Sequence, residues 1–304
     1  MVQAFEIAKV EINSTDVIFF ILELLFIVKV LNLNKIKNKT MKRLLLSAAM
    51  ISFLISCNIK SENGFPGNMI TKEGKGIIKT KQFELSFDEI KVSQSISAEI
   101  VKSNEEKVVV TAPEDIIDEI LVESVGGKLV VKFKPNLNIS AKNVAVKIFA
   151  KDFSRVEANS SADIKIKDQF VQDKTDIKVS SSGSISGNLE ANNMSIDVSS
   201  SGTFSGQIWA VDLTSEVSSS GDANLSGKTK NAKFDVSSSG TINAQKVDAE
   251  NAVINASSSG DASLSVSNQL TASASSSGDI NITRKGSLNV VSKKESSGGS
   301  VNIR

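Results

Sequence analysis

The chain has 304 residues, of which 35 are basic and 34 acidic, so its formal net charge is +1. This balance argues against a nucleic-acid partner, because a nucleic-acid-binding surface needs a surplus of basic side chains to displace counterions from phosphates. The chain has no histidine and one cysteine. It therefore lacks the commonest general base and metal ligand, and it can form neither an intrachain disulfide nor a thiolate zinc cluster.

Residues 1–40 contain an apolar run that is a poor membrane helix. The run lies within residues 16–33 and is interrupted by Glu23 and Lys29, and two charges in so short a span oppose insertion. We expect translation to start at Met41, which makes residues 1–40 an upstream extension. A membrane segment is the alternative. Either way, these residues are set aside in predicting the fold.

Residues 41–56 have the organisation of a secretory signal peptide. Lys42 and Arg43 form a positive start, and an apolar stretch follows at residues 44–55. The next four residues, Leu-Ile-Ser-Cys, end at Cys57 and resemble the bacterial lipobox. The resemblance implies that Cys57 is diacylated and becomes the first mature residue, since several acyl chains give stable anchoring. The alternative is a free thiol at the end of a membrane helix.

Two further segments precede the second half of the chain. Residues 57–76 are rich in Lys, Gly, Asn and Ser, which is typical of a flexible tether. Residues 77–153 contain strand-like runs with larger apolar side chains and more charge, such as Phe83–Val92 and Lys128–Phe133. We expect this segment to be an N-terminal β capping module that closes the open end of the next domain.

A tetrapeptide repeat characterises the next domain, residues 154–304. Ser-Ser-Ser-Gly recurs with steps of 19, 19, 19, 20 and 18 residues between its glycines. A degenerate copy, Asn159–Ala162, precedes these and another, Glu295–Gly298, follows. A fixed period of this length is typical of a solenoid. The middle serines and the glycines are its predicted structural positions: Ser181, Gly183, Ser200, Gly202, Ser219, Gly221, Ser238, Gly240, Ser258, Gly260, Ser276 and Gly278.

Apolar residues alternate with the period of two that strands require, as in Ile177, Val179 and Ile185 around one tetrapeptide. Aromatic residues make up 5% of the chain, so the chain is either partly disordered or builds its core by stacking many short strands of small residues, and the regular apolar spacing favours stacking. These patterns predict an all-β fold, a β-solenoid like a parallel β-helix, with coils of ~19 residues.

The middle serine of each tetrapeptide has the same phase as the buried Ile and Val. We therefore expect it to point inward and to hydrogen-bond between coils that lie about 4.8 Å apart. The first and third serines, such as Ser180 and Ser182, would form two rows facing solvent. The glycine is expected where a side chain would clash. Because Ala162 replaces it in the first copy, small size is the expected requirement.

Residues 77–304 resemble the head GIN domain family of putative auto-transporter adhesins, found in envelope lipoproteins of Bacteroidetes. The resemblance rests on the strand-like runs at Phe83–Val92, 96–101, 108–111 and 144–149, on the hairpin around Gly126 and Gly127, and on the serine-glycine repeats. It implies a β-helical fold and an exported location. The family supplies no catalytic residues.

The sequence contains few candidates for catalytic or metal-binding residues. Asp163, Asp222, Asp261 and Asp279 follow the repeat's small residue and could stack into a Ca²⁺-binding column, but other copies carry Ser184, Thr203 and Thr241 there. We therefore expect solvated turn residues, with no catalytic residue, metal or cofactor. Trp209 could stack a sugar ring, and the interpretation we favour is that it fills a corner of the solenoid.

The functional hypothesis is a non-enzymatic lipoprotein of the cell envelope, anchored in the outer membrane through Cys57 and facing the periplasm or the exterior. Its solenoid would present a face to a glycan or protein ligand, as an adhesion module does. One alternative is a structural envelope component without a specific ligand. Another is a carbohydrate-active β-helix enzyme, which a convergent acidic cluster would support.

Overall fold

A computed structural model describes residues 70–304 of the chain. The predicted extension at 1–40, the signal peptide at 41–56, the lipidation site Cys57 and most of the predicted tether lie outside these residues. In the described part, no helix is both long and apolar enough to cross a membrane.

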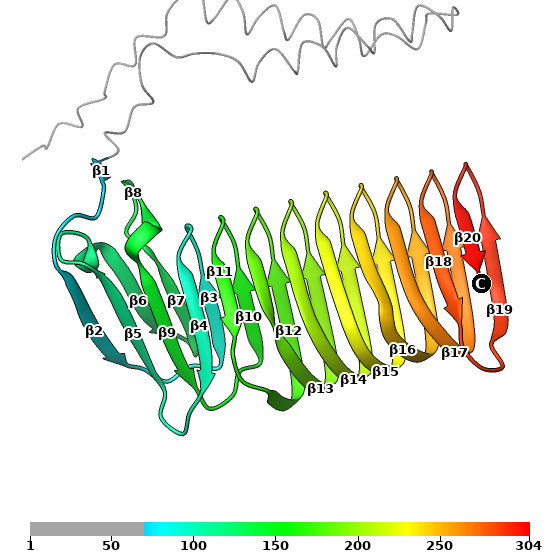
Figure 1. Ribbon diagram of the computed structural model, residues 1–304, viewed down its shortest axis with the longest axis horizontal. Coiled ribbons are helices and arrows are strands. Elements are labelled where there is room, and N and C mark those ends of the chain that lie inside the picture. The colour runs from blue at the N-terminus through cyan, green and yellow to red at the C-terminus, as the bar shows by residue number, and fades with distance from the viewer. Residues whose placement is uncertain (1–69) are drawn as a thin grey trace, which may run out of the picture. The chain divides into compact units, whose positions relative to one another are not determined.

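The first half of the described chain consists of short strands and two 3-10 turns (Figure 1). Their bounds are β1 (Ile70–Lys72), β2 (Ile78–Glu84), β3 (Glu89–Val92), β4 (Ser97–Lys102), β5 (Lys107–Pro113), η3 (Ile117–Glu119), β6 (Ile120–Val125), β7 (Lys128–Phe133), β8 (Leu137–Ile139), η4 (Ala141–Asn143) and β9 (Ala145–Ala150). β1 belongs to the segment for which the sequence predicts a tether, and it pairs in parallel with β8.

The second half is a stack of parallel coils. Its strands are β10 (Arg155–Ala158), β11 (Asp163–Ile166), β12 (Phe170–Val179), β13 (Ser184–Val198), β14 (Thr203–Val217), β15 (Asp222–Val236), β16 (Thr241–Ala256), β17 (Asp261–Ala274), β18 (Asp279–Arg284), β19 (Asn289–Glu295) and β20 (Ser300–Ile303). The pairing of β13 with β14 joins Ile185 to Phe204 and Val198 to Val217, a step of 19 residues. The predicted β-solenoid, with about 8 turns, is confirmed.

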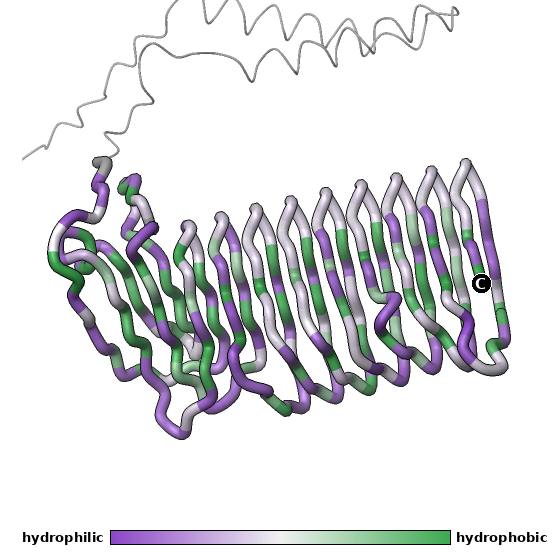
Figure 2. The backbone as a smooth tube through the Cα atoms, in the orientation of Figure 1, coloured by the Kyte–Doolittle hydropathy of each residue, from purple (hydrophilic) through white to green (hydrophobic). Residues whose placement is uncertain are grey.

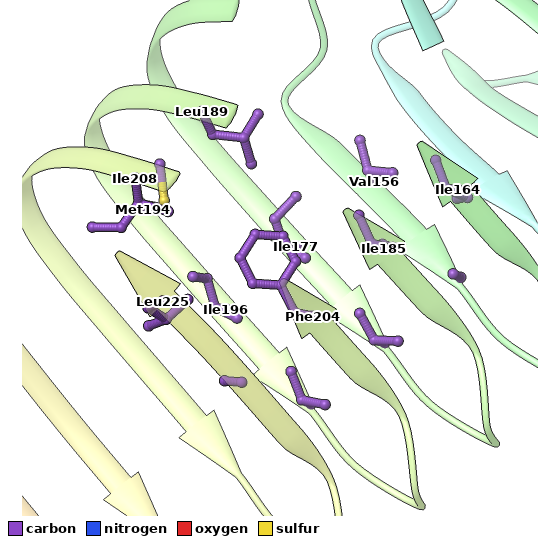
Figure 3. Close-up of a cluster of buried hydrophobic side chains, with 14 of the residues drawn as sticks. Val156, Ile164, Ile177, Ile185, Leu189, Met194, Ile196, Phe204, Ile208 and Leu225 are labelled. Atoms are coloured by element: carbon purple, nitrogen blue, oxygen red, sulfur yellow. The ribbon is translucent and has the colours of Figure 1, made fainter. Parts of the chain in front are cut away.

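Each coil runs along one sheet, bends at the edge opposite the serine turns, and returns along the other sheet (Figure 1). Hydrophobic and hydrophilic residues alternate along both sheets (Figure 2). The inward positions stack as columns, one of which contains Ile177, Ile196, Phe234 and Ile254. These four side chains are at most 1% exposed, and the close-up shows several of the core side chains between the two sheets (Figure 3). Burial of this kind, at about 25 cal/mol per Å² of apolar surface, drives the stacking.

The strands of residues 77–153 are not stacked in chain order. β3 pairs in parallel with both β7 and β10, and β4 pairs in parallel with both β9 and β11. The earlier β3 and β4 therefore lie between the later β7 and β9 and the serine-glycine coils. β2, β5 and β6 pair antiparallel with their neighbours at this end of the stack.

Candidate binding surfaces of the solenoid

The Ser-Ser-Ser-Gly tetrapeptides are tight turns along one edge of the solenoid. In the first full copy, Ser181 and Ser182 have φ of 50° and 60°, and the Gly183 N–H donates to the Ser180 carbonyl over 3.0 Å. Two successive residues with positive φ are the signature of a type I′ turn. The same pair of positive φ values recurs in all six copies.

The expectation that the middle serine points inward is wrong. Ser181 and its equivalents are exposed, as are the third serines, while the first serines are half-buried. The strand alternation stops at the turn, so it cannot be extended through the tetrapeptide. The ladder between turns runs through the backbone: the Ser182 N–H donates to the Ser200 carbonyl over 3.0 Å, and the Ser201 N–H to the Ser219 carbonyl over 3.1 Å. The outward rows are therefore the middle and third serines.

The glycine of each turn packs against the backbone of the preceding coil, which leaves no room for a side chain. It does not have positive φ. A Cβ atom on Gly240 would lie 2.9 Å from the Val217 carbonyl oxygen, closer than real Cβ contacts. In the last copy this position belongs to Gly299, whose Cβ would lie 2.5 Å from Ala274. Gly298, which the sequence places there, instead takes the third position with φ of 79°.

The sheet that follows each turn, which we call the polar face, carries two in-register rows of short polar side chains. The first row follows the glycine and consists of Asp163, Ser184, Thr203, Asp222, Thr241, Asp261, Asp279 and Ser300. The second lies two residues further on and consists of Ser186, Ser205, Asn224, Asn243, Ser263, Asn281 and Asn302. Successive residues of each row lie about 4.8 Å apart along the stack, so this face is a regular array of hydroxyl, amide and carboxylate groups.

The aspartates that follow the repeat's small residue thus lie in one row, which hydroxyl side chains interrupt as the sequence indicates. Only Asp261 and Asp279 are adjacent in it. Burial raises the pKa of Asp261, and the neighbouring charge of Asp279 raises it further. In the described residues, no group of three or more acidic, cysteine or histidine side chains is arranged to hold a metal ion.

The opposite sheet, which we call the charged face, carries ion pairs between coils. The Glu157 carboxylate forms ion pairs with Lys91 at 2.6 Å and with Lys128 at 3.2 Å. Arg155 forms an ion pair with Asp176 at 3.1 Å. Burial raises the pKa of Glu157, but the hydrogen bonds and charges of the two lysines outweigh it, so the pKa is lowered overall.

The charged face also carries an acidic row that was not predicted from the sequence. Asp197, Glu216 and Asp235 are in register in three successive coils. Each precedes the valine before a serine triplet, so the repeat spacing could have revealed the row. Lys178 lies 3.3 Å from Asp197 and Asn255 donates to Asp235 over 2.7 Å, which makes the row a partly paired, solvated surface.

Trp209 lies on the edge opposite the serine turns. The expectation that it fills a corner is wrong, because it is 53% exposed, and it is the one large aromatic side chain exposed in residues 70–304. Its register neighbours are Glu190 and Lys228. The indole lines two shallow depressions of about 360 and 430 Å³.

These features define the class of the protein: a parallel β-solenoid with extended polar surfaces. The chain belongs to the family described as "Putative auto-transporter adhesin, head GIN domain", whose sequence profile matches residues 86–286. No curated protein sequence matches the chain.

Solved structures share the fold. A putative adhesin from Parabacteroides merdae is 21% identical, with a TM-score of 0.71, over 77% of this chain and 99% of that chain. A putative adhesin from Parabacteroides distasonis is 19% identical, with a TM-score of 0.71, over 77% of this chain and 100% of that chain. A protein from P. distasonis named as a putative lipid binding protein is 22% identical, with a TM-score of 0.61, over 77% of this chain and 99% of that chain. Membership of this family indicates an adhesin-like role at the cell envelope.

Proposed function

We propose that the chain is a non-enzymatic lipoprotein of the outer membrane, anchored by acyl chains on Cys57, whose solenoid binds a glycan or protein as an adhesion module. The observation that carries this proposal is the polar face, where two rows of short polar side chains run in register over successive coils. An extended, regular surface suits a repetitive or extended ligand better than it suits one small substrate.

The anchor and the location can be tested together. Intact cells are treated with a protease, the mature N-terminus is read by mass spectrometry, and a Cys57→Ala variant is compared. We expect an acylated Cys57 as the first residue, release of the solenoid from intact cells, and loss of membrane attachment in the variant. Cleavage only after the outer membrane is opened would exclude adhesion to anything outside the cell.

The adhesion step needs its own experiment. Cells that express the chain and cells that lack it are compared for attachment to immobilised glycans and to host-cell or bacterial surfaces. Attachment that depends on the chain and is competed by the purified protein supports the proposal. Equal attachment by both strains would contradict it and favour a structural role in the envelope.

A further inference from the structure

The edge opposite the serine turns carries an exposed tryptophan, Trp209, that the stacking of the coils does not require. In the register row of Trp209, the adjacent coils carry the charged residues Glu190 and Lys228, and the coil after Lys228 carries Asp248. The phenylalanines of the coils at 204 and 234 are fully buried, so this indole is not part of the core. Leaving a large aromatic ring in water forgoes the stabilisation that its burial would give.

The depression on one side of Trp209 is rich in hydrogen-bonding groups. It is lined by Gln169, Asn188, Glu190, Gln207 and Lys228, with Gly227 and two aliphatic residues completing it. The Asn188 side-chain oxygen accepts the Gln207 backbone N–H over 3.4 Å, and Gln169 donates to Glu190 over 2.9 Å. Within the described residues, no hydrogen bond occupies the Gln207 side-chain amide and no carboxylate lies within ion-pair distance of Lys228.

Gly227 lines this depression where two coils approach each other closely. It has φ of 119°, and a Cβ atom there would collide with the Ile208 carbonyl oxygen. The backbone of the next coil therefore approaches Ile208 closely and places no side chain beside the indole at this point.

We propose that Trp209 and the amide-lined depression beside it form a binding subsite for a saccharide. A pyranose ring has an apolar C–H face and a rim of hydroxyl groups, which matches an aromatic plane bordered by donors and acceptors. The Gln207 amide can donate to one hydroxyl and accept from its neighbour, and Lys228 can donate to a third oxygen. This inference rests on the proposed adhesion function and names the chemical class of its ligand.

The surroundings of Trp209 disfavour two other partners. Insertion into a lipid surface would bury Glu190 and Lys228 with the indole, which is costly. A protein interface of ordinary size would need a larger apolar centre. The exposed Val171, at 62%, lies two coils away in the same register row, and Glu190 separates it from Trp209.

The composition of the chain provides a direct test. Trp209 is the single tryptophan and there is no tyrosine, so tryptophan emission reports on this site alone. The full chain, purified in a detergent without a sugar headgroup, is titrated with defined gluco-, galacto-, manno- and N-acetylglucosamine oligosaccharides. We expect at least one of them to shift or quench the emission with saturation. Gln207→Leu should weaken that binding about tenfold, as expected for losing about 1.4 kcal/mol of hydrogen bonding.

Gln245→Leu, on an exposed glutamine two coils further on, is the matched control and should bind as the wild type does. Trp209→Ala should not be retained on the immobilised oligosaccharide. An emission that no oligosaccharide changes, a response that Gln207→Leu leaves unaltered, or a shift produced only by phospholipid vesicles would each overturn the proposal. If cells that carry Trp209→Ala attach as wild-type cells do, the subsite is wrong while the adhesion function stands.

Discussion

Ser215 is a buried hydroxyl without a partner, and its removal should stabilise the protein. It lies in the core of β14 between Ile196 and Phe234 of the adjacent coils. Its side chain is fully buried, and its Oγ atom has no hydrogen-bond partner. Stacked coils carry apolar side chains at this position because nothing there can bond to a polar atom.

The size of the effect follows from the desolvation of the hydroxyl. An unpartnered buried hydroxyl costs about 1–3 kcal/mol in protein mutational data. Ser215→Ala keeps the Cβ atom and removes one oxygen, so the cavity it leaves costs less than that. We expect the free energy of unfolding to rise by about 1–2 kcal/mol, measured by equilibrium urea unfolding with circular dichroism.

Thr175 provides a matched control with the opposite sign. It is also fully buried, but its Oγ1 donates to the Gln172 side-chain oxygen over 2.8 Å. Thr175→Val keeps the shape and removes this bond, so it should destabilise the protein by about 1 kcal/mol. A Ser215→Ala variant that is no more stable than the wild type would refute the reasoning and would mean that an internal water satisfies the hydroxyl.

Three further changes test the turns and the charges. Gly240→Ala should lower the free energy of unfolding by about 1–3 kcal/mol through overpacking, whereas Ala162→Gly, at the position where alanine is native, should change it by about 1 kcal/mol or less in urea unfolding. Since burial and Asp279 raise the pKa of Asp261, its ionisation opposes folding, and Asp261→Asn should raise the melting temperature at pH 7; that gain should vanish as the pH falls below the ordinary carboxyl range. Since the two lysines outweigh burial and lower the pKa of Glu157, Glu157→Gln should lower the melting temperature at pH 7, and thermal scans should show this loss disappearing as the pH falls through the lowered pKa.

The stack of coils could be predicted from the period of the repeat, but the geometry of the turns could not. The alternation of apolar residues around Ile177 and Ile196 fixed which side of each strand faces the core, as the burial pattern confirms. The same alternation failed at Ser181, because a type I′ turn rotates the chain out of strand geometry. A serine pair is a weak sign of positive φ, since Asn-Gly is the usual signal for this turn.

The arrangement of β3 and β4 could not be read from the sequence either. The parallel pairing of β3 with β7 and β10, and of β4 with β9 and β11, joins segments that are far apart in the chain. No repeat spacing marks such a pairing, and connection rules alone favour neighbours in sequence. The exposure of Trp209, by contrast, follows from strand phase: it stands between the inward Ile208 and Ala210 in β14, so the alternation itself points its side chain outward.

Two departures from the repeat occur in one coil, β14. Trp209 exposes an aromatic ring where neighbouring coils carry polar residues, and Ser215 buries a hydroxyl where they carry apolar residues. The unpartnered Ser215 hydroxyl lowers stability and the exposed indole forgoes the stabilisation of burial, and departures of this kind concentrate at functional sites. If β14 serves ligand binding through Trp209 alone, Ser215→Ala should stabilise the chain and leave the emission maximum and the saccharide response unchanged. If β14 must also adjust on binding, the same substitution should weaken the response while raising the free energy of unfolding. Because one variant reports on both quantities, it separates a rigid subsite from one that needs a loosened coil.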